Sequence, residues 1–398
     1  MRINRGIDVF WPANPPPEIT EVAFSYAFCQ QTSQDFLERS DLAGDWIEHT
    51  SEWTLENGLS RSRGETVLIV LDPEIVISSI ALERMRLSMV AGFPACGPVY
   101  NFSDFLNQRA VLNVPYVNVS TYLEMAACIS QREKGVPVLV NELDAGCVLY
   151  QRDFLRTLDG GIKLDAVHRV FHPAVKTTAA VEKGALVHRF GSYYDGERDD
   201  LVLLVPETVQ RVMDIGCAKG GYGRRLKEIR PDIYILGVEL NPIMAQSARR
   251  YYDEIRTSSV ESLDIRSSFD LINCGDVLEH LEDPWAMLKR IAGLLRTGGY
   301  LVLSIPNAGH WSLVRDLIGG RFEYIPVGLT CVSHIRWFTE STIRKALENA
   351  GFSIDLIQRE QIPATPEGEI FIEGLCAATQ ADEVSLRTNE ILIRAVKK

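Results

Sequence analysis

Regular alternation of short apolar runs with helical segments is the feature that most restricts the fold of this chain. From Arg211 onward the sequence predicts strands over 211–215, 233–238, 269–274, 299–305, 352–359 and 389–396. Between them it predicts helices over 221–229, 242–252, 284–295 and 340–350. This alternation indicates βαβ units, in which helices cover both faces of a parallel sheet. We therefore expect a Rossmann-like, doubly wound α/β domain whose last strand is antiparallel.

A glycine-rich loop follows the first of these strands. Residues 216–223 read Gly-Cys-Ala-Lys-Gly-Gly-Tyr-Gly, so the backbone of the loop can approach a ligand closely. Ligands of open parallel sheets bind beyond the carboxyl ends of the strands, where this loop lies. Asp214, at the strand tip, is placed to bind an amino group or to shape the loop. Glu239, at the end of the next strand, is placed to accept both hydroxyls of a ribose.

A nicotinamide dinucleotide site shares this layout, and the spacing of the glycines separates the two interpretations. The dinucleotide pattern GxGxxG requires glycine where Ala218 stands, and a start at Gly216 or Gly221 gives no complete match. S-adenosylmethionine has no phosphate to place on the helix N-terminus, so it tolerates Ala218 and the bulkier Tyr222. The sequence favours S-adenosylmethionine over NAD.

Four segments, in this order, resemble the motif series of class I S-adenosylmethionine-dependent methyltransferases. They are residues 213–220, Glu239, residues 269–284 and residues 294–301. The resemblance covers about residues 185–398 and departs at Ala218, where many members have glycine. It implies that Glu239 holds the ribose, that residues 260–261 lie beside the adenine and that residues 275–277 line the cofactor. The expected cofactor-binding residues are Asp214, Gly216, Cys217, Ala218, Gly220, Glu239, Leu240, Val260, Glu261, Gly275, Asp276 and Val277.

The segments 304–311 and 333–339 are similar to a subgroup of these enzymes found beside glycosyltransferases in polysaccharide gene sets. Residues 193–194 and 198–201 share this similarity. It implies a saccharide or a glycan-linked molecule as the methyl acceptor.

Side chains of the same region are candidates for contacts with the acceptor. Aromatic rings stack on a sugar or fill a core, and the core is favoured for Phe338; the candidates are Trp311, Tyr324, Trp337 and Phe338. Arg336 either binds a phosphate or carboxylate of the acceptor or forms a salt bridge.

Three histidines are candidates for a general base. The sulfonium already carries the activation, so methyl transfer chiefly requires alignment of the acceptor atom with the methyl carbon, and no metal is expected. A hydroxyl acceptor gains roughly 10²- to 10⁴-fold in rate from a base. His280, His310 and His334 follow predicted strands, and each has a hydrogen-bonded structural role as its alternative.

The chain of 398 residues is longer than one hydrophobic core normally serves, so two domains are expected. We expect a flexible, proline-rich lead-in over 1–18, a first α/β domain over 19–162, a linker over 163–195 and the methyltransferase domain over 196–398. In the first domain the sequence predicts strands over 22–26, 65–71 and 137–140 and a helix that begins near Ser79.

Two stretches of the first domain, residues 56–74 and 144–155, resemble family 2 glycosyltransferases, which have the GT-A fold. In active members an acidic pair after a strand holds a divalent metal and the sugar nucleotide, and Asp72 and Glu74 stand there. The proline-rich start and the lack of a base motif after Cys147 depart from that pattern. We expect a degenerate glycosyltransferase-like domain; an active transferase and an unrelated α/β domain are the alternatives.

The composition argues against several classes of protein. A net charge of −12 disfavours nucleic-acid binding, which depends on basic side chains. No window approaches the roughly 20 apolar residues that span a bilayer, and the start lacks a signal-peptide core, so a cytoplasmic location is expected. The eight cysteines show no metal-ligand spacing and are expected to be buried thiols. A homodimer is one option for assembly.

The sequence therefore predicts an S-adenosylmethionine-dependent methyltransferase that methylates an oxygen of a saccharide or glycan-linked acceptor. Two other functions stay open. One is a glycosyltransferase that uses a nucleotide sugar through Asp72 and Glu74, with an accessory methyltransferase domain. The other is a non-catalytic scaffold that binds S-adenosylmethionine.

Overall fold

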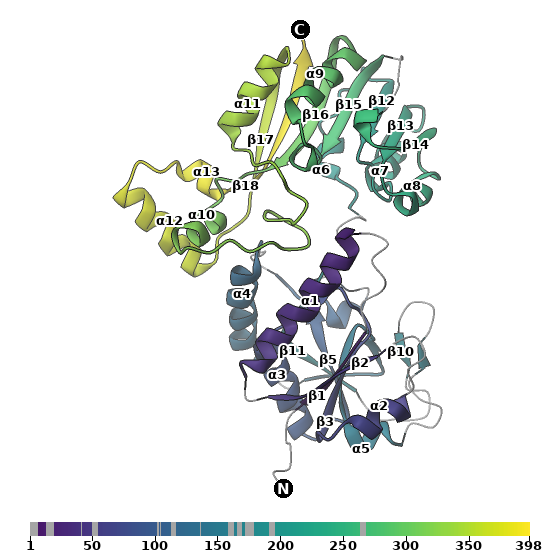
Figure 1. Ribbon diagram of the computed structural model, residues 1–398, viewed down its shortest axis with the longest axis vertical. Coiled ribbons are helices and arrows are strands. Elements are labelled where there is room, and N and C mark those ends of the chain that lie inside the picture. The colour runs from purple at the N-terminus through teal and green to yellow at the C-terminus, as the bar shows by residue number, and fades with distance from the viewer. Residues whose placement is uncertain are drawn as a thin grey trace. The chain divides into compact units, whose positions relative to one another are not determined.

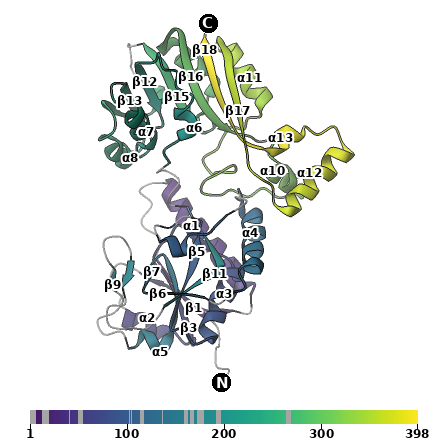
Figure 2. The same ribbon diagram turned by 180° about the vertical axis from the view of Figure 1, so that it is seen from behind.

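The structure is a computed structural model of the 398-residue chain, and it divides into two compact units, residues 1–191 and 192–398 (Figures 1 and 2). The structure describes residues 7–12, 20–40, 42–49, 55–101, 103, 105–112, 117–135, 137–157, 163–164, 169–171, 179–190, 196–262 and 268–398.

A seven-stranded sheet forms the centre of the second unit (Figure 1). Its order is β14 (Glu254–Thr257), β13 (Tyr234–Glu239), β12 (Arg211–Ile215), β15 (Phe269–Gly275), β16 (Leu295–Pro306), β18 (Thr388–Lys397) and β17 (Phe352–Gln361). The first five run parallel, and β18 is antiparallel to both its neighbours. The prediction of a Rossmann-like sheet with an antiparallel last strand is confirmed.

Helices cover both faces of this sheet because neighbouring residues of each strand face opposite cores. In β15, Ile272 packs in one core with α9 (Pro284–Leu294) and α11 (Glu340–Asn349). Leu271 packs in the other core, with α6 (Asp199–Val202), α7 (Gly221–Ile229) and α8 (Pro242–Ala248). The second unit is therefore a three-layer α/β fold.

Four helices, the strand β14 and two short turns of the second unit have no counterpart among the predicted elements, and α6 is one of these helices. The helices α10 (Trp311–Ile318), α12 (Pro366–Ala378) and α13 (Glu383–Arg387) pack on one another beside the sheet, around Trp311, Ile372 and Leu386 (Figures 1 and 2). The 3₁₀ turns η3 (Val260–Ser262) and η4 (Leu278–His280) follow β14 and β15.

The first unit is built on an eight-stranded mixed sheet. Its order is β2 (Ala43–His49), β1 (Ile7–Pro12), β3 (Thr66–Val70), β8 (Cys147–Gln151), β5 (Ala95–Tyr100), β11 (Ala179–Arg189) and β4 (Ile75–Ile77), with β6 (Val138–Val140) also on β11. A second, small sheet joins β7 (Glu142–Asp144), β10 (Arg169–Phe171) and β9 (Lys163–Leu164). The helical segments are α1 (Thr20–Glu38), α2 (Leu55–Arg61), α3 (Ser79–Val90), η1 (Leu106–Gln108), α4 (Val119–Arg132) and α5 (Arg152–Leu155). The strand over 66–70 and the helix that begins at Ser79 agree with the prediction.

Three expectations for the first unit are wrong. Residues 7–12, expected in a flexible lead-in, form β1 between β2 and β3, and Phe10 and Trp11 are fully buried. The strand expected over 22–26 lies within α1. Much of the expected linker is β11, which pairs with three strands. For β1 and β11, pairing with distant segments decided the conformation, and local composition did not show it. Residues 193–194, part of the subgroup similarity, lie outside the described residues.

Two expectations from composition concern the whole chain. Within the described ranges, no helix is both long enough and apolar enough to span a bilayer. All eight cysteines are free thiols; Cys128 is exposed and Cys376 half-buried, so the expectation of buried thiols holds for the other six.

Candidate methyl-donor and acceptor site

The loop between β12 and α7 takes left-handed backbone conformations at three positions. Gly216, Ala218 and Gly220 have φ of +74°, +45° and +93°. A Cβ on Gly216 would lie 2.7 Å from Cγ2 of Val277, and one on Gly220 would lie 2.9 Å from Cα of Ala248. Ala218 adopts the same region with a side chain, at a cost of roughly 1–2 kcal/mol. The left-handed backbone at residue 218 explains why many members of the family that the sequence resembles have glycine at this position.

Asp214 lies near the end of β12, just before the loop. Its carboxylate is buried and accepts hydrogen bonds from Nδ2 of Asn273 (2.7 Å) and from the hydroxyl of Tyr252 (2.5 Å). Burial raises the pKa of Asp214 to about 6, although the two donors act to lower it. Both oxygens are thus bound inside the protein, and the Tyr252 hydroxyl that donates to Asp214 also accepts from the backbone N–H of Gly223 (3.0 Å), which connects Asp214 to the start of α7.

The raised pKa of Asp214 gives a pH dependence. A carboxyl whose folded-state pKa exceeds the unfolded value of about 4 favours folding when protonated, and this contribution is lost as pH rises through about 6. The variant Asp214→Asn mimics the protonated group at every pH. Its melting temperature relative to the natural protein is expected to increase from pH 4 to pH 7 in thermal unfolding scans. A difference that is constant over this range would contradict the shift.

Glu239 connects the second strand to the same loop. Its carboxylate accepts hydrogen bonds from the backbone N–H of Ala218 (2.9 Å) and of Asn241 (2.8 Å). An ionised carboxylate offers about four acceptor positions, so about two remain beyond these two backbone donors. Glu239 thus holds the loop at the end of β13.

The structure brings the expected cofactor-binding segments to one edge of the sheet. They follow the carboxyl ends of the neighbouring parallel strands β12, β13, β14 and β15. Val260 in η3 is buried, whereas Glu261 and Leu240 are exposed at this edge. Asp276 follows β15 in a left-handed conformation with φ of +52°. The expected cofactor-binding segments therefore lie together at this edge of the sheet.

An ion-pair cluster beneath Asp276 was missed at the level of sequence. Arg198 contacts the carboxylates of Asp276 (2.7 Å), Asp200 (2.8 Å) and Glu390 (2.8 Å). Burial, followed by the charge of Asp276, raises the pKa of Glu390 to about 8. The pairing of β16 with β18 brings residue 390 here, and no local motif indicates it.

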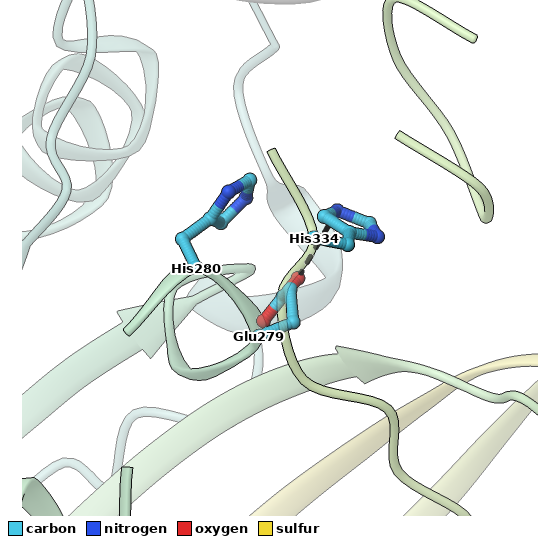
Figure 3. Close-up of side chains that lie close together, drawn as sticks. All are labelled: Glu279, His280 and His334. Carbon is cyan, nitrogen blue, oxygen red and sulfur yellow. Dashed lines mark ion pairs between the residues drawn. The ribbon is translucent and has the colours of Figure 1, made fainter. Parts of the chain in front are cut away.

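A second cluster lies beyond β15, where Glu279, His280 and His334 gather from two separate chain segments (Figure 3). Nε2 of His334 lies 3.9 Å from Oε1 of Glu279, and both of these side chains are buried. Burial, then the charge of Asp276, raises the pKa of Glu279 well above its usual range. Burial lowers the pKa of His334 to about 4, so this imidazole is neutral at pH 7. Glu279 was not among the residues expected at the site, although it is adjacent to His280.

His310, the third expected base, is the N-cap of α10. Its Nδ1 accepts from the backbone N–H of Ser312 and lies 2.9 Å from the hydroxyl of that residue. Burial lowers the pKa of His310 to about 4. In the structure His310 therefore makes a capping contact at the start of α10.

The expected acceptor contacts divide between core and surface. Phe338 and Trp311 are buried in two different cores. Trp337 and Tyr324 are exposed, and Phe322 lies in edge contact with both. Arg336 donates to the backbone carbonyls of Glu282 and Ile335, neither of which is the expected carboxylate or phosphate partner.

Comparison with known proteins agrees with this geometry. The family model of a methyltransferase domain matches residues 186–357. A ubiquinone biosynthesis O-methyltransferase of Xanthomonas axonopodis is 29% identical over 156 residues, which cover 36% of this chain and 63% of the relative. One of Xanthomonas campestris is 32% identical over 123 residues, 29% of this chain and 50% of the relative. The chain thus spans between half and 63% of the length of these curated relatives.

Among solved structures, an S-adenosylmethionine-dependent methyltransferase of Mesorhizobium loti is 21% identical and covers 50% of this chain and 97% of its own, with a TM-score of 0.36. The family match and the strand order of the second sheet carry the assignment. The second unit of this protein contains a class I S-adenosylmethionine-dependent methyltransferase domain.

Proposed function

We propose that this protein transfers the methyl group of S-adenosylmethionine to an oxygen atom of a saccharide or glycan-linked acceptor. S-adenosylmethionine as the methyl donor is supported by one observation: Asp214, the glycine loop and Glu239 converge at one edge of the sheet. No phosphate-binding GxGxxG turn competes for this edge. The curated relatives are named O-methyltransferases, which supports oxygen as the methylated atom.

The acceptor is proposed to lie beside η4, next to His280 and His334. Val277, which precedes η4, lies against the position of a Cβ on Gly216, so this turn adjoins the methyl-donor loop. Each histidine has Nδ1 within hydrogen-bond distance of a backbone carbonyl, Ser333 for His280 (3.2 Å) and Leu329 for His334 (3.0 Å). A carbonyl only accepts, so Nδ1 carries the proton and Nε2 the lone pair in both rings. These two histidines thus retain the chemistry that a hydroxyl acceptor needs.

The exposed aromatic residues Phe322, Tyr324 and Trp337 support an acceptor with a ring. Trp337 also lies in edge contact with His334, with ring centroids 6.0 Å apart. Stacking on such side chains suits a pyranose or an aromatic ring. An aromatic hydroxyl acceptor is the second candidate, because the curated relatives act in ubiquinone biosynthesis by name. Methyl transfer from labelled S-adenosylmethionine to a panel of saccharides and a panel of phenols separates the two.

The donor site is tested by the variant Glu239→Ala. Loss of charge-assisted hydrogen bonds, which contribute about 1.5–3 kcal/mol each, is expected to weaken S-adenosylmethionine binding tenfold or more in calorimetric titration. Glu228→Ala, in the exposed pair of Glu228 with Arg225 on α7, removes the same charge away from the site and should leave affinity within about twofold. Unchanged binding by Glu239→Ala would overturn the ribose assignment.

For the first unit we propose a degenerate glycosyltransferase-like module that positions the acceptor. The guanidinium of Arg189 pairs with Asp72 (2.7 Å) and with Asp144 (2.8 Å), and it lies 4.2 Å from the ring centre of Tyr100. An internal cation that already neutralises both carboxylates leaves little affinity for a divalent ion at Asp72. This contact argues against a glycosyltransferase that uses Asp72 and Glu74. Heat from titration with nucleotide sugars and Mn²⁺ would favour that alternative. Binding of S-adenosylmethionine without methyl transfer to any acceptor would favour the non-catalytic scaffold.

A further inference from the structure

The inference rests on the cluster of Glu279, His280 and His334 and on the proposed function. One ligand atom from each of these residues lies within 4.8 Å of the other two (Figure 3). Among the residues that the structure describes, no other such group of three or more histidine, cysteine or acidic side chains is found. We propose that the cluster binds a divalent transition-metal ion, which holds the acceptor oxygen for methyl transfer.

The burial of Glu279 and its lack of hydrogen-bond partners are the first observation that supports a bound ion. Its side chain is 2% exposed, and neither carboxylate oxygen has a hydrogen-bond partner. Nε2 of His334, which is neutral at pH 7, lies 3.9 Å from Oε1 of Glu279, too far for a hydrogen bond. A buried acidic side chain without hydrogen-bond partners is costly whether it is protonated or ionised, and coordination of its carboxylate to a cation would offset that cost.

The orientation of the histidines is the second observation. As argued above, both rings carry the proton on Nδ1 and donate it to the backbone carbonyls of Ser333 and Leu329. Histidine ligands in metal sites characteristically donate their second ring nitrogen to a carbonyl or carboxylate, which leaves the other nitrogen as the ligand. Nε2 of each histidine is therefore in the tautomeric state that binds a metal.

The backbone holds the two segments together. The carbonyl of Glu279 accepts from the N–H of Ile335 (2.9 Å) and of Arg336 (3.0 Å), which fixes the loop of His334 against η4. Metal–ligand bonds of about 2.1 Å place neighbouring ligand atoms about 3–3.5 Å apart. The side chains therefore close by roughly an ångström around the ion, a change that rotation about their side-chain bonds provides.

The ligand set selects the kind of ion. Two imidazoles and one carboxylate suit Zn²⁺, Fe²⁺, Mn²⁺ or Co²⁺, whereas Mg²⁺ prefers oxygen ligands and retained water. Three protein ligands leave coordination positions open, as in catalytic sites. This differs from the expectation, drawn from the sequence, that no metal takes part.

The ion would act on the acceptor. A hydroxyl oxygen bound to the ion loses its proton to solvent more readily, because the positive charge stabilises the oxyanion. The oxygen then attacks the methyl carbon, the carbon–sulfur bond breaks, and its electron pair stays on sulfur to give S-adenosylhomocysteine. An acceptor with two adjacent oxygens, such as a vicinal diol, would occupy two open positions and be held in one orientation. The histidines then act as ligands, and the ion replaces a general base.

The test uses the full, tag-free chain after treatment with a chelator. Titration with Co²⁺ is expected to give a visible d–d absorption band that saturates at one ion per chain, and titration with Zn²⁺ is expected to abolish it. Glu279→Gln and His280→Ala should each weaken Co²⁺ binding by more than about tenfold. His310→Asn, which keeps an N-cap for α10 and lies outside the cluster, is the matched control and should bind Co²⁺ as the natural protein does.

Binding of S-adenosylmethionine to the same variants separates this inference from the proposed function. If the natural chain binds S-adenosylmethionine but no Co²⁺, or if Glu279→Gln and His280→Ala bind Co²⁺ normally, the metal site is wrong and the methyltransferase proposal stands. If Mg²⁺ saturates the site and Co²⁺ does not, the assignment to a transition metal is wrong. Absence of S-adenosylmethionine binding by the natural chain overturns the proposed function, whatever the metal result.

Discussion

Replacement of Arg189 by alanine is expected to destabilise the first unit by about 3–5 kcal/mol, because it leaves the charge of Asp144 buried without its partner. Both terminal nitrogens of Arg189 bind the Asp144 carboxylate at 2.8 Å, and its Nε binds Asp72. Burial alone would raise the pKa of Asp144, but the hydrogen bonds and charge of Arg189 outweigh it and lower the pKa. The stabilisation is therefore complete at neutral pH and is lost as pH falls below the unfolded value of about 4.

Urea unfolding of Arg189→Ala measures the loss of stability. Amide hydrogen exchange in β5 and β8 shows whether the loss occurs in the first unit. Arg156→Ala is the matched control, because Arg156 pairs with Asp153 on the surface at 3.3 Å. That change should alter stability by no more than about 0.5 kcal/mol. Similar losses for the two variants would show that the Arg189 cluster contributes no more than a surface ion pair. Binding of Mn²⁺ by Arg189→Ala, absent from the natural protein, would add that Arg189 occupies a former cation site.

Gly220→Ala is expected to cost about 2–5 kcal/mol and to abolish tight binding of S-adenosylmethionine. A side chain at φ of +93° costs roughly 1–2 kcal/mol, and overpacking against Ala248 adds roughly 1–3 kcal/mol. The contact is with backbone, since the Cβ would lie 2.9 Å from Cα of Ala248, so no side-chain rotation relieves it. The loop would shift and carry the N–H of Ala218 away from Glu239.

Gly351 provides the comparison. Its φ of +88° is nearly the same, but a Cβ there meets nothing within 4 Å. Gly351→Ala should therefore lose only the stability that the left-handed backbone conformation costs a side chain, roughly 1–2 kcal/mol, and it should keep its affinity for the methyl donor. Thermal unfolding and calorimetric titration of both variants provide the measurement. Equal losses at the two positions would refute the steric argument for the loop.

The strands and the glycine loop of the second unit were predictable because their determinants are local. Apolar runs such as residues 211–215 and 269–274 lie in the sheet as predicted. The glycines at 216 and 220 adopt conformations that side chains resist. The acidic ends of β12 and β13 follow directly from these runs. In contrast, β1 and β11 gain their stability from pairing with distant strands, so the prolines and the weak periodicity of those segments gave a wrong prediction.

The sequence by itself determined the α/β architecture of the second unit and the expectation of a methyl-donor site, since periodicity, glycine positions and residue order are properties of neighbours along the chain. Only the tertiary structure decided which charges meet. It placed Arg189 between Asp72 and Asp144, Arg198 beside Glu390, and His334 beside Glu279. These partners are between 45 and 192 residues apart in sequence. Each contact contributes to stability because a buried charge without a partner is costly. Such contacts arise from strand order and loop packing, which no local pattern encodes.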